Sequence, residues 1–88
     1  MNLKLNGKRY KLRYVSGVSY LGECDPPSLA GKEIRINADV TGEKLLDTYL
    51  HEFLHALYWH IDEDHIAKPA EDLARALWRL GYRMKEDE

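Results

Sequence analysis

TGEKLLDTYLHEFLHALYWH, residues 41–60, is the longest stretch of the chain with the periodicity of an α-helix. Its apolar residues recur at intervals of three and four positions, as they do on one side of an amphipathic helix. They are Leu45, Leu46, Tyr49, Leu50, Phe53, Leu54, Ala56 and Leu57. The pattern predicts a helix over residues 42–60, capped by Thr41, whose apolar half packs against another layer of the fold.

The residues before this helix show the alternation that is typical of β-strands. Asn6-Gly7 separates two alternating runs and is a strong signal for a two-residue hairpin turn. The pairs predicted across this turn are Leu3 with Tyr10, Lys4 with Arg9 and Leu5 with Lys8. EIRIN, residues 33–37, alternates in the same way. We therefore expect residues 1–37 to form a small sheet of three or four strands.

A second amphipathic stretch follows the acidic residues 62–64. Pro69 suits the first position of a helix and Gly81 suits its end, so we predict a helix over residues 69–80. A chain of 88 residues buries only one thin core, which favours a single domain over residues 1–88. The expected fold class is α+β: an N-terminal antiparallel hairpin and small sheet packed on two helices.

Composition argues against several classes of protein. The net charge is −2, from 13 basic and 15 acidic residues, which lacks the basic excess of a dedicated nucleic-acid binder. Cys24 is the one cysteine, so no intrachain disulfide can form, and a free thiol suits a reducing compartment. No apolar run approaches a membrane span and the first residues lack the apolar core of a signal peptide. We expect a cytoplasmic protein. Because a chain this small usually needs a staple and a disulfide is excluded, a metal ion is a possible one.

His51-Glu52-Phe53-Leu54-His55 is an H-E-x-x-H motif inside the first predicted helix. Residues four apart lie one helical turn above each other, so His51 and His55 can bind the same Zn²⁺. Glu52 lies beside them and can serve as general base toward a metal-activated water. The simpler alternative is a pair of surface histidines on a helix.

A catalytic zinc site needs a third protein ligand and an open position. Glu71, in the first turn of the second predicted helix, is the expected third ligand, although it could instead pair with Arg75. His65 is the second choice. His60 and a carboxylate of residues 62–64 are the remaining alternatives.

HEFLHALYWH, with EIRIN before it and PAEDLARALWRL after it, resembles the small zincin-like metallopeptidases of the gluzincin type. The chain is most similar to short H-E-x-x-H proteins of bacteriophages and bacteria, related to SprT-like and phage-repressor-cleaving peptidases. The resemblance covers residues 29–80, and it implies a place in the host cytoplasm if the protein is phage-encoded. Tyr58 and Ile61 stand where metzincins have a glycine and a third histidine, so the metzincin arrangement is disfavoured.

The resemblance implies His51 and His55 as ligands, Glu52 as base, and a glutamate on the following helix, Glu71, as third ligand. It also implies that the strand before the motif helix is a sheet edge, where residues 34–36 could bind an extended substrate.

Together these patterns predict a zinc-dependent metallopeptidase that hydrolyses a protein or peptide substrate. The alternative is a zinc-stapled binding module that captures a partner without catalysis, and a metal-free interaction domain is a third candidate. Residues 1–22 contain no acid and five bases, which are Lys4, Lys8, Arg9, Lys11 and Arg13. This basic hairpin face could contact nucleic acid, although such a face is more often simply solvated.

Overall fold

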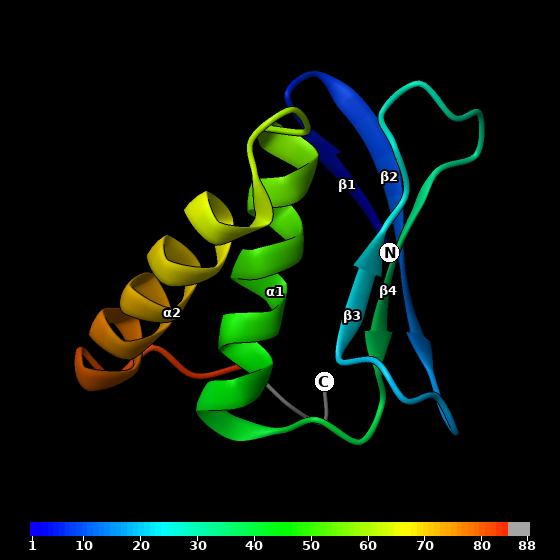
Figure 1. Ribbon diagram of the computed structural model, residues 1–88. Coiled ribbons are helices and arrows are strands. Elements are labelled where there is room, and N and C mark those ends of the chain that lie inside the picture. The colour runs from blue at the N-terminus through cyan, green and yellow to red at the C-terminus, as the bar shows by residue number, and fades with distance from the viewer. Residues whose placement is uncertain (85–88) are drawn as a thin grey trace.

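The computed structural model, which describes residues 1–84, has a four-stranded sheet on one side and two helices on the other (Figure 1). The helix that follows the sheet in sequence packs directly on it, and the second helix packs on the first rather than on any strand. The expected α+β class is therefore confirmed. Neither helix of the described part is long and apolar enough to cross a membrane.

The N-terminal hairpin forms as predicted from β1 (Asn2–Leu5) and β2 (Lys8–Val15). Asn6 and Gly7 connect them with φ values of 53° and 75°, the left-handed conformation that a two-residue turn of this kind requires. The observed pairs are Leu3 with Tyr10, Lys4 with Arg9 and Leu5 with Lys8, as the sequence predicts.

The strand order is β1-β2-β4-β3, with β3 (Gly22–Cys24) at one edge and β4 (Glu33–Asn37) in the interior. β4 runs parallel to β2 and antiparallel to β3. The expectation that the strand before the motif helix is an edge is therefore wrong. After β2 the chain first forms β3 and then returns to place β4 between the two, so residues 34–36 are paired on both sides.

Alternating residues of the sheet form the core together with one side of the first helix. The members are Tyr10, Leu12, Ile34 and Ile36 from the sheet and Tyr49 and Ala56 from the helix. Burial of these side chains removes apolar surface from water and fixes which side of the sheet the helix covers. Within residues 1–84, no helix lies on the other face of the sheet (Figure 1).

The first helix, α1 (Gly42–Leu57), contains the whole motif but ends before the predicted residue 60. Tyr58 leaves helical geometry, with φ −130° and ψ 60°, and its N–H still bonds the carbonyl of Leu54 at 2.8 Å. The chain then turns within a few residues to start the next helix, so His60 lies in the turn.

The second helix, α2 (Glu63–Arg79), begins earlier than the predicted range of 69–80, which corrects that prediction. Glu63 and Asp64 occupy its first turn, where the helix dipole favours negative charge, so the acidic stretch starts the helix instead of interrupting it. Pro69 lies inside, where it removes one main-chain hydrogen bond. The buried residues that pack toward α1 recur every four positions: Ile66, Ala70 and Ala74.

Candidate metal centre

α1 brings the two motif histidines together. The ring centroids of His51 and His55 are 4.8 Å apart, as expected for residues one helical turn apart. Their side chains are 23% and 19% exposed, so both rings are partly shielded by the fold but reachable from solvent. The helix thus supplies two neighbouring imidazole nitrogens that face the same space.

Glu63, the first residue of α2, completes the cluster. Its Oε1 lies 2.7 Å from Nε2 of His55, and its Oε2 lies 2.9 Å from Nε2 of His51. The short turn after α1, closed by a 3.0 Å bond from the N–H of Ile61 to the carbonyl of Tyr58, brings this carboxylate back over the histidines. One carboxylate therefore bridges both imidazoles.

The donor set of His51, His55 and Glu63 fits a metal ion. One ligand atom from each lies within 4.8 Å of the others. A tetrahedral zinc ion with bonds of about 2.0–2.2 Å keeps its ligand atoms roughly 3.3 Å apart, slightly more than the two hydrogen-bond distances here. Glu63 can open that space because its side chain is 62% exposed. His51, His55 and Glu63 are thus a candidate metal site.

Glu52 lies beside the cluster in a different environment. It is only 7% exposed and is one of the few charged or polar residues of the described chain that the fold buries. Burial, followed by the negative charges of Glu63 and Glu23, raises the pKa of its carboxyl to about 7. A carboxyl of this kind can hold or release a proton near neutral pH.

The structure places the other predicted third ligands outside this group. Glu71 is paired within α2: its Oε1 lies 3.4 Å from Nζ of Lys68 and 3.7 Å from Nη2 of Arg75. His65 is 76% exposed and faces Asp62 at 4.0 Å. The third member of the cluster comes instead from the acidic stretch of residues 62–64, one of the alternatives that the sequence leaves open. The sequence signal for this ligand is the pair of acids Glu63 and Asp64, because acidic residues are typical of the first turn of a helix.

Two hollows flank the cluster. One of about 420 Å³ is lined by Cys24, Arg35, His55 and Trp59, among others. The second, of about 340 Å³, extends in the other direction and is lined by Leu21, Lys44, Asp47 and Glu71, among others. Both are also lined by Gly22, His51 and Glu52. The candidate site therefore lies along a groove and is open on both sides.

The free edge of β3 borders this groove. The N–H of Asn37 bonds the carbonyl of Leu21 at 2.8 Å, and the N–H of Asp25 bonds the carbonyl of Glu33 at 3.0 Å. Successive residues of an antiparallel strand direct their main-chain groups to opposite sides. Gly22 and Cys24 consequently direct their N–H and C=O groups away from β4, toward the groove.

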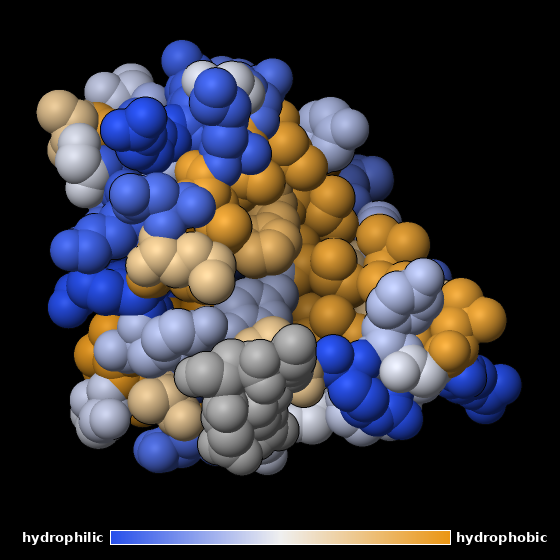
Figure 2. All heavy atoms as spheres, turned by 180° about the vertical axis from the view of Figure 1, so that it is seen from behind, coloured by the Kyte–Doolittle hydropathy of each residue, from blue (hydrophilic) through white to orange (hydrophobic). Residues whose placement is uncertain are grey.

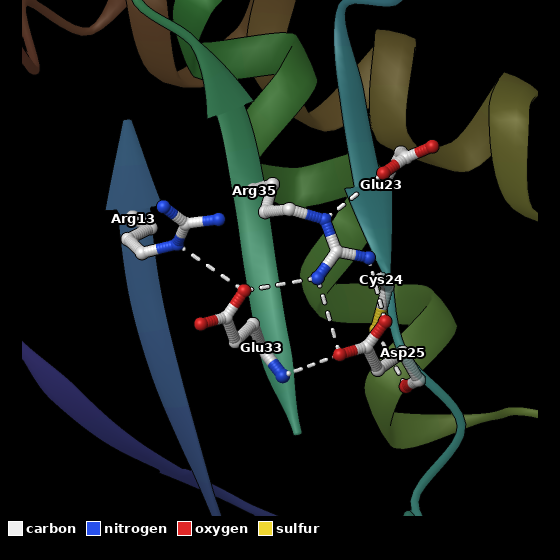
Figure 3. Close-up of polar contacts among 6 residues, drawn as sticks. All are labelled: Arg13, Glu23, Cys24, Asp25, Glu33 and Arg35. Carbon is white, nitrogen blue, oxygen red and sulfur yellow. Dashed lines mark hydrogen bonds and ion pairs between the residues drawn. The ribbon is translucent and has the colours of Figure 1, made fainter. Parts of the chain in front are cut away.

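On the solvent side of the sheet, Arg35 fixes the edge strand (Figure 3). Its Nη2 lies 2.6 Å from Oδ1 of Asp25 and its Nε lies 2.9 Å from Oε1 of Glu23. The hydrogen bonds from Arg35 lower the pKa of the Asp25 carboxyl, so this residue stays ionised opposite the guanidinium. A third carboxylate, Glu33, accepts a 3.0 Å bond from Nη1 of the same side chain.

Two other surfaces lie apart from the cluster. Hydrophobic side chains gather on the back of the molecule (Figure 2). An apolar hollow of about 400 Å³ is lined by Val40, Leu45 and Trp78, among others, and by none of the candidate ligands. Lys4 and Arg9 stand directly opposite each other on the uncovered side of the hairpin, and contact with nucleic acid through this face stays a prediction.

Comparisons of the chain with protein-family models, with curated proteins and with solved structures found no match. The fold and the cluster therefore carry the functional argument by themselves: an α+β domain with an H-x-x-x-H pair and a bridging glutamate.

Proposed function

We propose that the protein is a zinc-dependent peptidase whose metal is held by His51, His55 and Glu63 and whose general base is Glu52. The observation that carries the proposal is the buried carboxylate of Glu52 next to a two-histidine, one-carboxylate cluster. A metal that only staples two helices needs no buried carboxylate beside its ligands, and burying a carboxyl is unfavourable for folding. The buried carboxylate of Glu52 therefore favours a catalytic zinc site over a purely structural one.

Two imidazoles and one carboxylate leave one position of a four-coordinate zinc ion open. When bound, zinc supplies a Lewis acid that makes a water molecule more acidic and polarises a carbonyl group. His51, His55 and Glu63 would hold the ion, and the groove beside them would give water and a substrate access to it.

Glu52 moves the proton. It takes a proton from water as the water oxygen attacks the carbonyl carbon of the peptide bond, and it gives this proton to the amide nitrogen as the C–N bond breaks. The products are a carboxylic acid and an amine, and Glu52 returns to its ionised form. No further co-reactant is needed.

The groove suggests how an extended peptide would lie. The N–H and C=O groups of Gly22 and Cys24 can add the substrate to the sheet as a further strand. The hollows on both sides of His51 leave room for residues before and after the cleaved bond. We therefore expect cleavage within a peptide chain.

The alternative is a zinc-stapled binding module without catalysis. It is favoured by the position of Glu63, which would let one metal ion join α1 to α2 in a domain with a thin core. The two functions share the metal site and differ in the role of Glu52.

The test is cleavage of a peptide library by the zinc-loaded protein and by Glu52→Gln. We expect Glu52→Gln to bind zinc like the wild type and to lose at least about 100-fold in kcat. Glu43→Gln, the same change in the first turn of the same helix, is the matched control and should keep full activity. A fully zinc-loaded wild type that cleaves no peptide would support the binding module instead.

A further inference from the structure

Gly22 differs from every other glycine of the chain. The glycines with positive φ, where a side chain would be strained, are Gly7, Gly17, Gly31, Gly42 and Gly81. Gly22 has no positive φ and is the first residue of β3, a position that any residue can occupy in an extended conformation. Backbone conformation therefore does not explain why this position has no side chain.

Space explains it. A methyl group at Gly22 would lie 2.9 Å from Cγ2 of Thr48, and 3.0 Å and 3.1 Å from Cγ and Oε2 of Glu52. The two carbon–carbon distances are below the roughly 3.5 Å at which carbon atoms attract each other, and the contact with Oε2 is also tighter than usual. Gly22 thus lets the edge strand approach the carboxylate of Glu52 more closely than any other residue could.

The surroundings leave little room for adjustment. Thr48 is 4% exposed, and its Oγ1 donates a 2.8 Å bond to the carbonyl of Lys44. On the opposite face of β3, Glu23 forms an ion pair with Arg35 of β4 (Figure 3), which helps to hold the edge strand in the sheet. A side chain at position 22 would therefore press on both Thr48 and Glu52, and at least one of these contacts would have to open.

We propose that Gly22 is a positioning residue for Glu52. Because Gly22 has no side chain, the side chain of Glu52 can occupy the space against β3 that orients its carboxylate toward the metal centre. The inference rests on the proposed role of Glu52 as general base. The edge strand would then have two roles. The main-chain groups of Gly22 would bind the substrate, and the missing side chain of the same residue would orient Glu52.

The experiment compares Gly22→Ala with Gly31→Ala. Gly31 has φ 67°, and a methyl group at this position would have no atom within 4 Å, so Gly31→Ala strains the backbone without touching the site. Each zinc-loaded variant is measured for zinc affinity, for kcat and KM on a cleaved peptide, and for binding of acetohydroxamate. The ligand chelates zinc, and its acid form, acetohydroxamic acid, can donate the hydroxyl proton to a neighbouring carboxylate, so its affinity reports on Glu52 without turnover.

We expect Gly22→Ala to bind zinc within about threefold of the wild type, and to lose about tenfold or more in kcat and in acetohydroxamate affinity. KM should change less than kcat. Gly31→Ala should match the wild type in all of these. Adding Thr48→Ser to Gly22→Ala removes Cγ2 and should recover part of both losses.

Wild-type acetohydroxamate affinity in Gly22→Ala would overturn the proposal. If the wild type cleaves no peptide but binds acetohydroxamate in a manner that depends on Gly22 and Glu52, the peptidase function fails while the positioning role stands. If peptides are cleaved and Gly22→Ala keeps full kcat, the positioning role fails and the peptidase stands.

Discussion

Oε1 of Glu63 lies 2.7 Å from Nε2 of His55, which joins the first residue of α2 to the last turn of α1. The contact depends on the early start of α2, because a helix that began at Pro69 would leave Glu63 in the preceding loop. The same carboxylate reaches His51 through its other oxygen at 2.9 Å. Metal binding should therefore depend on Glu63 and should hold the two helices together.

The two candidate glutamates should differ sharply in their effect on zinc binding. Glu63→Ala should weaken zinc binding by more than about 100-fold because it removes a direct ligand. Glu71→Ala should change zinc affinity by less than about threefold, since Glu71 is occupied by Lys68 and Arg75. Competition with a chromogenic chelator measures both. The opposite ranking would restore Glu71 as the third ligand.

Zinc should also stabilise the fold. Zinc that bridges α1 and α2 binds the folded chain only, so free zinc at about 1,000 times its Kd should raise the unfolding free energy by about 4 kcal/mol. For a domain of this size the melting temperature should rise by about 15 °C or more. His55→Ala is the control and should melt at the same temperature with and without zinc. An equal shift in that variant would mean that the metal binds elsewhere.

The Arg35 cluster should make stability depend on pH. The pKa of Asp25 is lowered in the folded state by hydrogen bonds from Arg35, whereas the unfolded chain has the ordinary value of about 3.9. The stabilisation is therefore complete above the unfolded pKa and is lost as the pH falls through the folded one. Arg35→Met should lower the unfolding free energy by about 1–2 kcal/mol at neutral pH.

Urea unfolding at neutral pH, at mildly acidic pH and well below the ordinary pKa of an aspartate checks this. The difference between wild type and Arg35→Met should be equal under the first two conditions and smaller under the third. Arg75→Met, whose side chain is 52% exposed, serves as control and should cost less than about 0.5 kcal/mol. A difference that did not vary with pH would show that Arg35 stabilises β3 by packing alone.

The hairpin should respond to a change of charge at Lys4. Lys4 and Arg9 are direct cross-strand partners of like charge, which is mildly destabilising. Lys4→Glu should raise the melting temperature by about 1–4 °C at low salt, with most of the gain lost in about 1 M NaCl. Lys4→Gln removes the repulsion without adding attraction, so its melting temperature should lie between those of the wild type and Lys4→Glu. A lower melting temperature for Lys4→Glu would contradict the observed register.

Local patterns are sufficient to predict the hairpin and the motif helix. Asn6-Gly7 fixes the turn and, with it, every pair between β1 and β2, because the side-chain alternation allows one register. His51, Glu52 and His55 can be placed together because four residues make about one turn of any helix. These features depend on neighbours in the sequence.

Long-range features have no such local signal. EIRIN alternates in polarity like a half-buried strand, and nothing in its letters says that it lies between β2 and β3 instead of at an edge. Pro69 suits a helix start, but the helix begins six residues earlier, where Glu63 and Asp64 interact favourably with the helix dipole. The sequence does not single out Gly22, because its reason for being a glycine is a contact with a distant helix.

X-ray absorption at the zinc edge of the loaded protein tests the central claim most directly, because it reports the atoms that bind the metal. The arrangement of His51, His55 and Glu63 predicts two imidazole nitrogens at about 2.0 Å, one carboxylate oxygen, one further light ligand and no sulfur. Loss of one imidazole signal in His55→Ala would identify His55 as a ligand. A first shell that contains sulfur, or one without two imidazoles, would contradict this metal centre.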